Sequence, residues 1–282
     1  MSTALLLAIG AMLSGAMSDL LYRKAQMTGI KAAGFLAVQS TLFAGSLWIY
    51  VLATGQMSFA VPATFVYGIP GGIFAYVGLL LFVQSLRTGS AGVNVPIFRL
   101  SFVVTAAGGV LLLGEPANLA KLAGTVLAII SVLSLLDVKA LASGKAGSIG
   151  KGLFIGTFLF GLVGLLARQA AIEGSPAIPL IAAQSIPFEL CAVTYAVASR
   201  QLDFGPTTLR YAPMVAVFQL GWSIMLFQSL QSGQASISYP IVQLSFVVTA
   251  VLAAIFLREP LNRQKLGGLG LACLAVLAFA LS

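Results

Sequence analysis

The feature that most constrains this chain is a succession of apolar stretches, each near the ~20 residues that cross a bilayer as an α-helix. Of its 282 residues, 59% are hydrophobic and only 8% are charged. A soluble domain carries about 25% charged residues, and a globule of this size cannot bury so much apolar surface. Hydrocarbon must therefore be the solvent for most of the surface, and we expect an all-α integral membrane protein.

Ten transmembrane helices are predicted from these stretches and from the glycine and proline residues between them. They cover residues 3–23, 33–53, 63–87, 90–113, 117–136, 150–171, 177–198, 208–230, 234–257 and 261–281. The first is expected to be a membrane helix and not a cleaved signal peptide, because its basic residues follow it. Small-residue spacings such as Gly68 and Gly72 predict close packing between helices.

An internal repeat divides the chain into two homologous halves. Residues 84–106 realign with residues 228–250 at a constant offset of 144, with 14 of 23 positions identical. The same offset joins Glu115/Glu259 and Lys121/Lys265, and an offset of 145 joins Arg23/Arg168 and Gln39-Ser40/Gln184-Ser185. Chance similarity between apolar segments does not keep such residues in register. The repeat predicts halves at residues 1–138 and 150–282, joined by a linker over residues 139–149.

Each predicted half holds five helices, so the second half should enter the membrane upside down relative to the first. Inverted repeats commonly enclose a site near the membrane midplane in secondary transporters, whose halves rock to give alternating access. The expected fold is therefore two inverted five-helix repeats around a central cavity. Its expected partners are a small-molecule substrate and membrane lipids, and the sequence leaves a homodimer open.

Basic residues gather at one face of the predicted bundle. Counted by helix order, the face opposite the N-terminus holds 12 of the 15 Lys and Arg residues, and the N-terminal face holds Lys121 and Arg168. The remaining one, Arg99, lies inside a helix. Because cytoplasmic loops are rich in Lys and Arg, both termini are expected outside a cell inner membrane. Topology thus explains the net charge of +8 without a nucleic-acid partner.

Several function classes are excluded by what the sequence lacks. There is no histidine, which removes Ser-His and Cys-His catalytic pairs and histidine metal sites. There is no GxxxxGK[ST] motif for a nucleotide, so an ATP-driven pump is not expected. Cys191 and Cys273 lie in apolar stretches, and no disulfide is expected between them. We expect a protein that is not an enzyme and that needs no cofactor or metal.

Residues 100–124 carry the pattern LSFVVTAxxxxLLLGEPxxLxKLxG, and a copy of the surrounding segment recurs over residues 235–268. This segment resembles the EamA repeat of the drug/metabolite transporter superfamily. The resemblance covers both halves. It implies a ten-helix bundle with a central cavity lined mainly by helices one, three and four of each half. Members of this family usually have cytoplasmic termini, which differs from the orientation that the loop charges predict.

Arg99 requires an explanation, because a charge at the bilayer centre costs about 2.5–3.5 kcal/mol. Its guanidinium fork matches a carboxylate or phosphate of a substrate. The alternative is a structural ion pair with Glu189 or Asp19. The repeat places neutral Gln243 opposite Arg99, and such asymmetric positions are candidates for substrate choice. Asp19 either lines the cavity near its mouth or pairs with Arg23, one turn along the helix.

Glu189, near the middle of predicted helix 177–198, is the candidate for proton coupling. A carboxyl group inside a membrane can take up and release a proton during a transport cycle. The alternative is a pair with a basic side chain. Pro96 and Pro240 each remove a helix hydrogen bond, so each is either a hinge or a static kink.

Other polar and aromatic side chains in the third and fourth helices of each half either contact a substrate or bridge helices: Asn94, Tyr239, Tyr76, Gln219 and Trp222. The sequence is compatible with two functions. The first is a secondary exporter or exchanger of small metabolites or drugs, such as carboxylate-bearing amino acids, with or without proton coupling. The alternative is a lipid or lipid-linked sugar translocase of the same superfamily.

Overall fold

In the computed structural model the chain is described over residues 2–26, 28–56, 59–88, 94, 97–134, 151–257 and 263–281. All regular structure in these residues is α-helical, as the apolar stretches predict. The helices are α1 (Thr3–Gln26), α2 (Ala32–Thr54), α3 (Ala63–Thr88), α5 (Ser101–Leu111), α6 (Leu119–Ser134), α8 (Lys151–Ile172), α9 (Ala177–Ala198), α10 (Pro206–Ser232), α11 (Ala235–Gln243), α12 (Ser245–Leu257) and α13 (Arg263–Ala280). Within this part of the chain, six helices, α1–α3 and α8–α10, are long and apolar enough to cross a membrane, and four further apolar helices are shorter.

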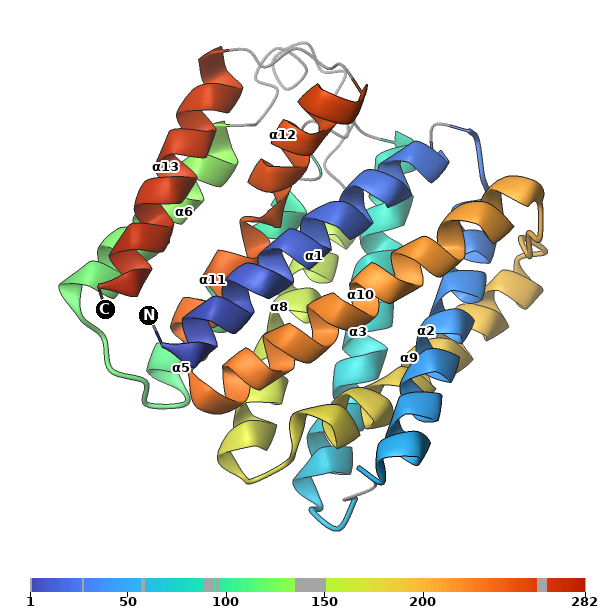
Figure 1. The fold of residues 1–282 in the computed structure, drawn as a ribbon, viewed down its shortest axis with the longest axis horizontal. Coiled ribbons are helices and arrows are strands. Elements are labelled where there is room, and N and C mark those ends of the chain that lie inside the picture. Colours follow the sequence, from blue (N-terminus) through green and yellow to red (C-terminus); the bar gives the residue numbers. More distant parts are fainter. Residues whose placement is uncertain are drawn as a thin grey trace.

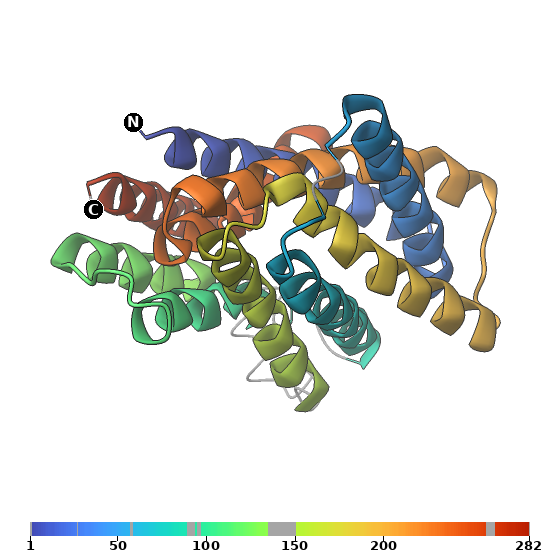
Figure 2. The same ribbon diagram turned by 90° about the horizontal axis from the view of Figure 1, so that it is seen from below.

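The helices of the two halves are interleaved (Figure 1, Figure 2). α1 packs beside α10 and α3 packs beside α8, so the first helix of each half lies against the third helix of the other. α2 packs on α9 and α6 packs on α13, which joins second helix to second and fifth to fifth. The α1–α10 and α3–α8 contacts are counterparts of each other, and the other two contacts join equivalent helices of the two halves. The helix pairing is therefore symmetric between the halves.

The predicted helix 234–257 is not continuous, which corrects the sequence expectation. It is divided at Leu244 into α11 and α12. Pro240 lies inside α11, one turn before the break, and has no N–H to donate. The Leu244 amide is shared between the carbonyl oxygens of Pro240 and Ile241, at 3.2 and 3.1 Å. The helix therefore tightens and ends at this point.

A related interruption occurs in the first half. Residues 97–99 are helical, Leu100 is a turn residue, and α5 begins at Ser101. Pro96 lies outside the described residues, so its hinge role stays a prediction. Because Leu100 and Leu244 are repeat mates, the break is a property of the repeated sequence. Since Leu244 is 1% exposed, the break places helix ends inside the bundle.

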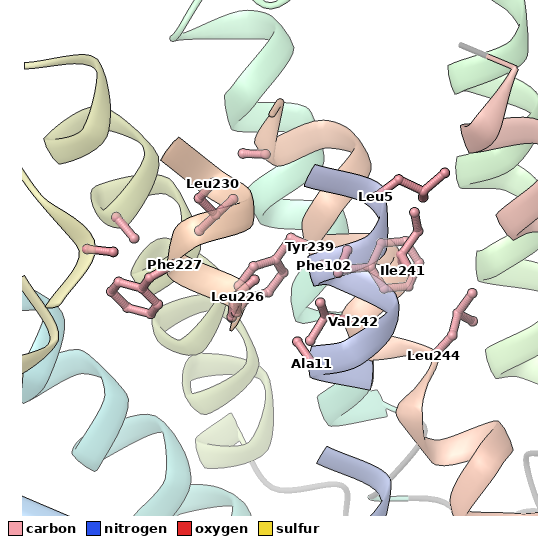
Figure 3. Close-up of a cluster of buried hydrophobic side chains, with 14 of the residues drawn as sticks. Leu5, Ala11, Phe102, Leu226, Phe227, Leu230, Tyr239, Ile241, Val242 and Leu244 are labelled. Atoms are coloured by element: carbon pink, nitrogen blue, oxygen red, sulfur yellow. The ribbon is translucent and has the colours of Figure 1, made fainter. Parts of the chain in front are cut away.

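The main apolar core lies where α11 meets α1, α5 and α10. Five of its large side chains, Phe102, Leu226, Leu230, Tyr239 and Ile241, are each less than 2% exposed. Figure 3 shows them gathered around α11. α11 is only 9 residues long, too short to be stable alone. Its position therefore depends on this packing.

Two glycines of α3 allow α9 to approach closely, as the small-residue spacing predicts. A β-carbon at Gly68 would lie 2.8 Å from the Ala183 Cβ. A β-carbon at Gly72 would lie 2.7 Å from the Pro187 Cγ and would collide with the carbonyl oxygen of Gln184. The contact therefore fixes the backbone of α9 against α3.

We expect Gly72→Ala to lower the melting temperature by several degrees. Overpacking a rigid interior costs about 1–3 kcal/mol, and the Gln184 carbonyl cannot rotate away from the added methyl group as a flexible side chain could. Gly45→Ala is the matched control, because no atom lies within 4 Å of a β-carbon at that site. Thermal unfolding of both variants in the same detergent measures the difference. Equal melting temperatures would contradict the close contact.

Candidate functional site

A cavity of about 220 Å³ lies between the two halves of the bundle. Its walls come from α1, α2 and α3 of the first half and from α8, α9, α10 and α11 of the second, together with Phe98 and Arg99. Much of the wall is aromatic, through Tyr22, Phe43, Phe82, Phe98, Phe160, Phe188, Trp222, Phe227 and Tyr239. Such a cavity suits a small molecule with an apolar part and a few polar groups.

Asp19 and Arg99 are the charged residues of this wall, and they form an ion pair. Nη2 of Arg99 donates to Oδ2 of Asp19, and Nη1 donates to Gln243 Oε1 at 3.0 Å. The Gln243 amide nitrogen donates in turn to Ser101 Oγ at 3.3 Å. The side chains of Arg99 and Asp19 keep 17% and 32% of their surface exposed. Both charges are therefore within reach of a molecule in the cavity.

Of the two partners weighed for Arg99 from the sequence, the structure selects Asp19. The alternative, an Asp19–Arg23 pair, stays a prediction, because the Arg23 side chain is outside the described part of the structure. Because the two charges cancel, the cavity wall is electrically neutral overall. Among the described residues, no group of three or more Cys, Asp or Glu side chains could hold a metal ion.

Three more of the predicted residues line the cavity: Gln219, Trp222 and Tyr239. Gln219 accepts a hydrogen bond from Ser18 Oγ at 3.2 Å. Tyr239 donates one to a carbonyl oxygen of α8 at 3.1 Å. The Trp222 ring packs over Gly15, where a β-carbon would lie 2.8 Å from Cδ1. Gln243 joins the group through its bond to Arg99.

The other predicted residues lie away from the cavity wall. Tyr76 is 6% exposed and packs edge-on against Phe188, with 5.6 Å between ring centroids. Asn94 is buried and donates to the Ser85 carbonyl oxygen at 2.8 Å. Glu189 faces α2, where a threonine hydroxyl donates to its Oε1 at 2.5 Å. These three residues are not brought together with the Asp19–Arg99 pair.

Sequence reasoning missed the part of the wall that the second helix of each half supplies. Gln39 and Ser40 on α2, and Gln184 and Ser185 on α9, all line the cavity. Helices one, three and four of each half still supply most of the wall, as the resemblance implies, and the second helices add to it. The sequence does contain a sign of this. The Gln-Ser pair occurs at equivalent positions of two apolar helices, and polar side chains in such helices usually face away from lipid.

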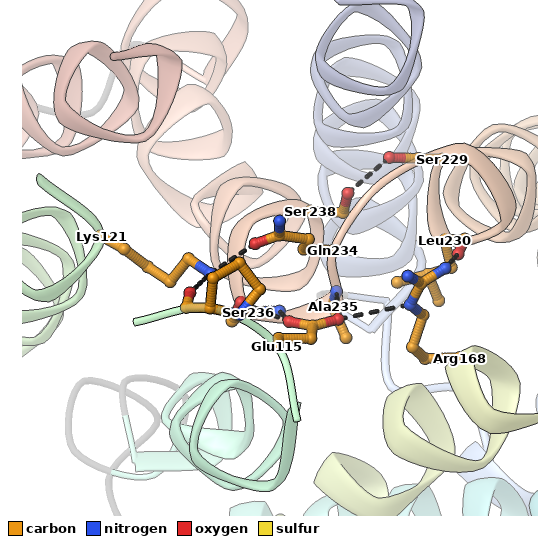
Figure 4. Close-up of polar contacts among 10 residues, drawn as sticks. Glu115, Lys121, Arg168, Ser229, Leu230, Gln234, Ala235, Ser236 and Ser238 are labelled. Carbon is orange, nitrogen blue, oxygen red and sulfur yellow. Dashed lines mark hydrogen bonds and ion pairs between the residues drawn. The ribbon is translucent and has the colours of Figure 1, made fainter. Parts of the chain in front are cut away.

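A second polar cluster lies at the end of the bundle where the chain begins (Figure 4). The Glu115 carboxylate accepts hydrogen bonds from the backbone amides of Ala235 and Ser236, at 2.6 and 2.9 Å, and from the Ser236 hydroxyl. These amides begin α11, so a carboxylate of the first half caps a helix of the second and complements its dipole. Arg168 pairs with the same carboxylate at 3.3 Å and donates to the Leu230 carbonyl oxygen at 2.7 Å.

Further contacts join the two halves at the same end. Thr64 Oγ1 and Ser175 Oγ lie 2.8 Å apart, and Ser229 Oγ donates to the Ala4 carbonyl oxygen at 2.7 Å. These contacts and the Glu115 cluster are called the N-terminal seal below. On α10 the seal begins within one turn of the cavity, because Phe227 lines the cavity and Ser229 belongs to the seal. The seal therefore lies next to the N-terminal end of the cavity.

Comparison with known proteins matches one family profile to the chain twice. The sequence matches the profile of the EamA-like transporter family over residues 2–136 and again over residues 151–281. An uncharacterized protein of Methanocaldococcus jannaschii is 25% identical over 131 residues, which cover 46% of this chain and 94% of that protein. A solved crystal structure shares the fold with a TM-score of 0.77 at 16% identity, over 99% of this chain and 97% of that one.

Proposed function

Because the chain belongs to the EamA-like transporter family, we propose that it is a secondary transporter of a small zwitterionic metabolite of the amino-acid class. The observation that carries this proposal is the Asp19–Arg99 ion pair in the cavity wall. All other residues of the wall are apolar or carry uncharged polar groups. Neither the family match nor the cavity lining favours the alternative of a lipid or lipid-linked sugar translocase.

The ion pair selects a zwitterion because each of its charges needs a partner. A substrate carboxylate fits the planar fork of the Arg99 guanidinium, and a substrate ammonium fits the Asp19 carboxylate. A zwitterion can therefore replace one internal pair with two external pairs while the cavity stays neutral. A simple anion would leave Asp19 without a counterion in a mostly apolar wall, which makes its binding less favourable. The aromatic wall would hold the apolar part of the substrate.

Ten membrane crossings in two inverted halves are part of the proposal. Four apolar helices accompany the six that are long enough to cross, and they occupy the remaining expected segments. The pairing of each helix type across the halves supports a two-fold axis. The archaeal relative, of which 94% aligns with 46% of this chain, supports an origin by duplication. An odd number of helices in each half makes the halves antiparallel.

Alternating access requires the N-terminal end of the cavity to open at another stage of the cycle. The seal at this end is built from contacts between the halves, such as Glu115 with the first amides of α11 and Thr64 with Ser175. We expect these contacts to break when the halves rock. α11, which ends inside the bundle at Leu244, is the element that Glu115 would release.

The N-terminal face is proposed to lie outside the cell, since it holds only two of the 15 basic residues. Both are engaged: Arg168 pairs with Glu115, and Lys121 Nζ donates to the Pro116 carbonyl and the Gln234 side chain. A C-terminal fusion to a reporter that is active only in the cytoplasm should therefore be inactive. A fully active fusion would reverse the orientation and place the termini in the cytoplasm.

Proton coupling is proposed to use Glu189. One oxygen of its carboxylate accepts the hydrogen bond from Thr41, and the other, Oε2, is buried without a partner in the structure. A proton on Oε2 would remove a negative charge that lies within an apolar helix. Glu189→Gln should therefore keep solute exchange but lose the acceleration that a pH gradient gives to net uptake. If the variant responds to the gradient as the wild type does, the coupling group is elsewhere.

The zwitterion proposal is tested by thermal stabilisation of the purified protein. Three probes share a phenylalkyl group: phenylalanine carries both charges, 3-phenylpropionate only the carboxylate, and phenethylamine only the ammonium. A ligand at about 100 times its Kd stabilises a protein by about 2.7 kcal/mol. We expect phenylalanine to raise the melting temperature more than either partial analogue at equal concentration. Equal or larger shifts with 3-phenylpropionate would overturn the zwitterion in favour of an anion.

A further inference from the structure

Helix α11 belongs to the second half of the chain, but residues of the first half hold it at both ends. At its start, the backbone amides of Ala235 and Ser236 donate to the Glu115 carboxylate, at 2.6 and 2.9 Å. At its last residue, Gln243 accepts a hydrogen bond from Arg99 at 3.0 Å. The first contact belongs to the N-terminal seal and the second to the ion pair of the cavity. α11 therefore connects the seal to the cavity.

The structure allows α11 to move as one body. Its 9 residues span about 13 Å at the rise of an α-helix, and the hydrogen bonds within the helix keep this length fixed. The break at Leu244 separates α11 from α12, because the Leu244 amide is bonded to carbonyl oxygens of α11. A displacement at the last residue of α11 can therefore reach its first residue while α12 stays in place.

The Gln243 side chain is held in one orientation. The residue is 2% exposed, its Oε1 accepts the hydrogen bond from Nη1 of Arg99, and its Nε2 donates to Ser101 Oγ at 3.3 Å. Because both ends of the amide are engaged, the amide cannot turn without losing a bond, and an unpaired buried polar group is costly. We therefore expect Gln243 to follow the Arg99 guanidinium when that group changes its position.

The proposed solute would move Arg99, because it replaces Asp19 as a partner of the guanidinium. Nη2 of Arg99 donates to Asp19, whereas Nη1 donates to Gln243, so a solute carboxylate in the place of Asp19 can leave the second bond intact. The tolerance at the other end of α11 is small. A shift of the Ala235 amide by about 1 Å would lengthen its 2.6 Å bond to Glu115 beyond hydrogen-bonding distance.

We propose that Gln243 is a positioning residue that transmits occupancy of the cavity to the N-terminal seal through α11. When the solute binds Arg99, Gln243 follows the guanidinium and α11 shifts. Glu115 then loses its bonds to the first amides of α11, and the open state of the seal becomes more populated. This inference rests on the proposed function, because it needs a solute that binds Arg99. It adds the step by which binding favours opening.

A buried residue of the seal can report the opening. Ser229 is 0% exposed, and its Oγ lies 2.7 Å from the Oγ of Ser238 on α11 (Figure 4). The reporter chain carries Ser229→Cys and has both native cysteines replaced by serine. Its new thiol should react slowly with a water-soluble maleimide while the seal is closed. We expect saturating phenylalanine to raise the labelling rate about 10-fold, in proportion to the open population.

Gln243→Met removes the amide and keeps the length of the side chain. In the reporter chain this variant should still bind phenylalanine, measured as a rise in melting temperature, but should be labelled at the same rate with and without it. A residue that only stabilises the fold would not separate binding from labelling in this way. Gln264→Met is the matched control, since Gln264 is exposed, lies outside the cavity wall and bonds the Ser134 carbonyl oxygen. It should respond as the reporter chain does.

Ser101→Ala is a milder second variant, because it removes only the hydroxyl group that orients the Gln243 amide. It should reduce the effect of phenylalanine on labelling while binding is retained. If Gln243→Met does not fold, Ser101→Ala alone decides the question. An undiminished effect in every variant that folds would overturn transmission through Gln243.

The outcomes separate this inference from the proposed function. If the reporter chain binds phenylalanine but its labelling rate does not rise, the transmission is wrong and the zwitterion site stands. If wild type binds no amino acid of a panel that includes phenylalanine, glutamine and methionine, both proposals are overturned.

Discussion

Arg99→Gln is expected to lower the rate of solute exchange at least about 100-fold, which corresponds to about 2.8 kcal/mol of lost binding. Glutamine keeps hydrogen-bonding capacity and is the residue that the second half carries at this position, Gln243. It cannot offer the charged fork that binds a carboxylate. The exchange of a labelled amino acid in proteoliposomes measures the effect.

A matched set of variants separates binding from folding. Arg99→Gln alone leaves Asp19 without its counterion, so some of its effect can arise from loss of folded protein. The double variant Asp19→Asn/Arg99→Gln removes both charges and should fold as stably as wild type, yet should not exchange the solute. Arg210→Gln is the control for loss of a positive charge, because Arg210 is exposed and lies 5.5 Å from the ring of Tyr211. Exchange by the double variant at the wild-type rate would show that the pair has only a structural role.

Cross-linking the N-terminal seal is expected to stop transport reversibly. The hydroxyl oxygens of Thr64 and Ser175 are 2.8 Å apart, and the two residues are 0% and 1% exposed. Sulfur atoms at these positions would lie within reach of a disulfide. In a chain with both native cysteines replaced by serine, Thr64→Cys/Ser175→Cys should form the bond on oxidation. Exchange should then fall to the level of protein-free liposomes and recover after reduction.

The single variants Thr64→Cys and Ser175→Cys are the controls, since neither can form this bond. They should exchange solute at rates that do not change with oxidation. Full exchange by the oxidised, quantitatively cross-linked double variant would mean that the N-terminal end does not open between α3 and the loop before α9. The alternating-access part of the account would then need a different moving contact.

The apolar stretches and the repeat predicted the helical fold and the family, because both are patterns within the sequence itself. Breaks at Leu100 and Leu244 were partly visible in advance, through the repeated proline four residues before each. The predicted continuous helix 234–257 was wrong because proline and the buried packing at Leu244 act together. A hydropathy window averages over such a single-residue break.

The site was predictable only in part. Arg99, Asp19, Gln219, Trp222 and Tyr239 are residues singled out from the sequence that do line the cavity. Their pairing was not determined by sequence, because Arg99 meets a carboxylate 80 positions away. The contribution of α2 and α9 was missed because asymmetry between the halves was taken as the sign of specificity.

The contact between Glu115 and the start of α11 is another long-range contact that the sequence could not predict. Its partners lie 120 and 121 positions away. The residues next to Glu115 in the sequence therefore do not indicate them. The repeat marked Glu115 as part of the shared frame. Only the packed structure shows that this carboxylate holds a half-helix of the opposite repeat.

Counterflow in proteoliposomes tests the central claim most directly, that a zwitterion crosses the membrane through the Asp19–Arg99 cavity. Vesicles loaded with unlabelled amino acid are diluted into labelled amino acid, with wild type, Asp19→Asn/Arg99→Gln or no protein in the membrane. Wild type should accumulate label transiently, and the other two should not. Label entering all three at the same rate, for every amino acid of a panel that includes phenylalanine, glutamine and methionine, would contradict the account.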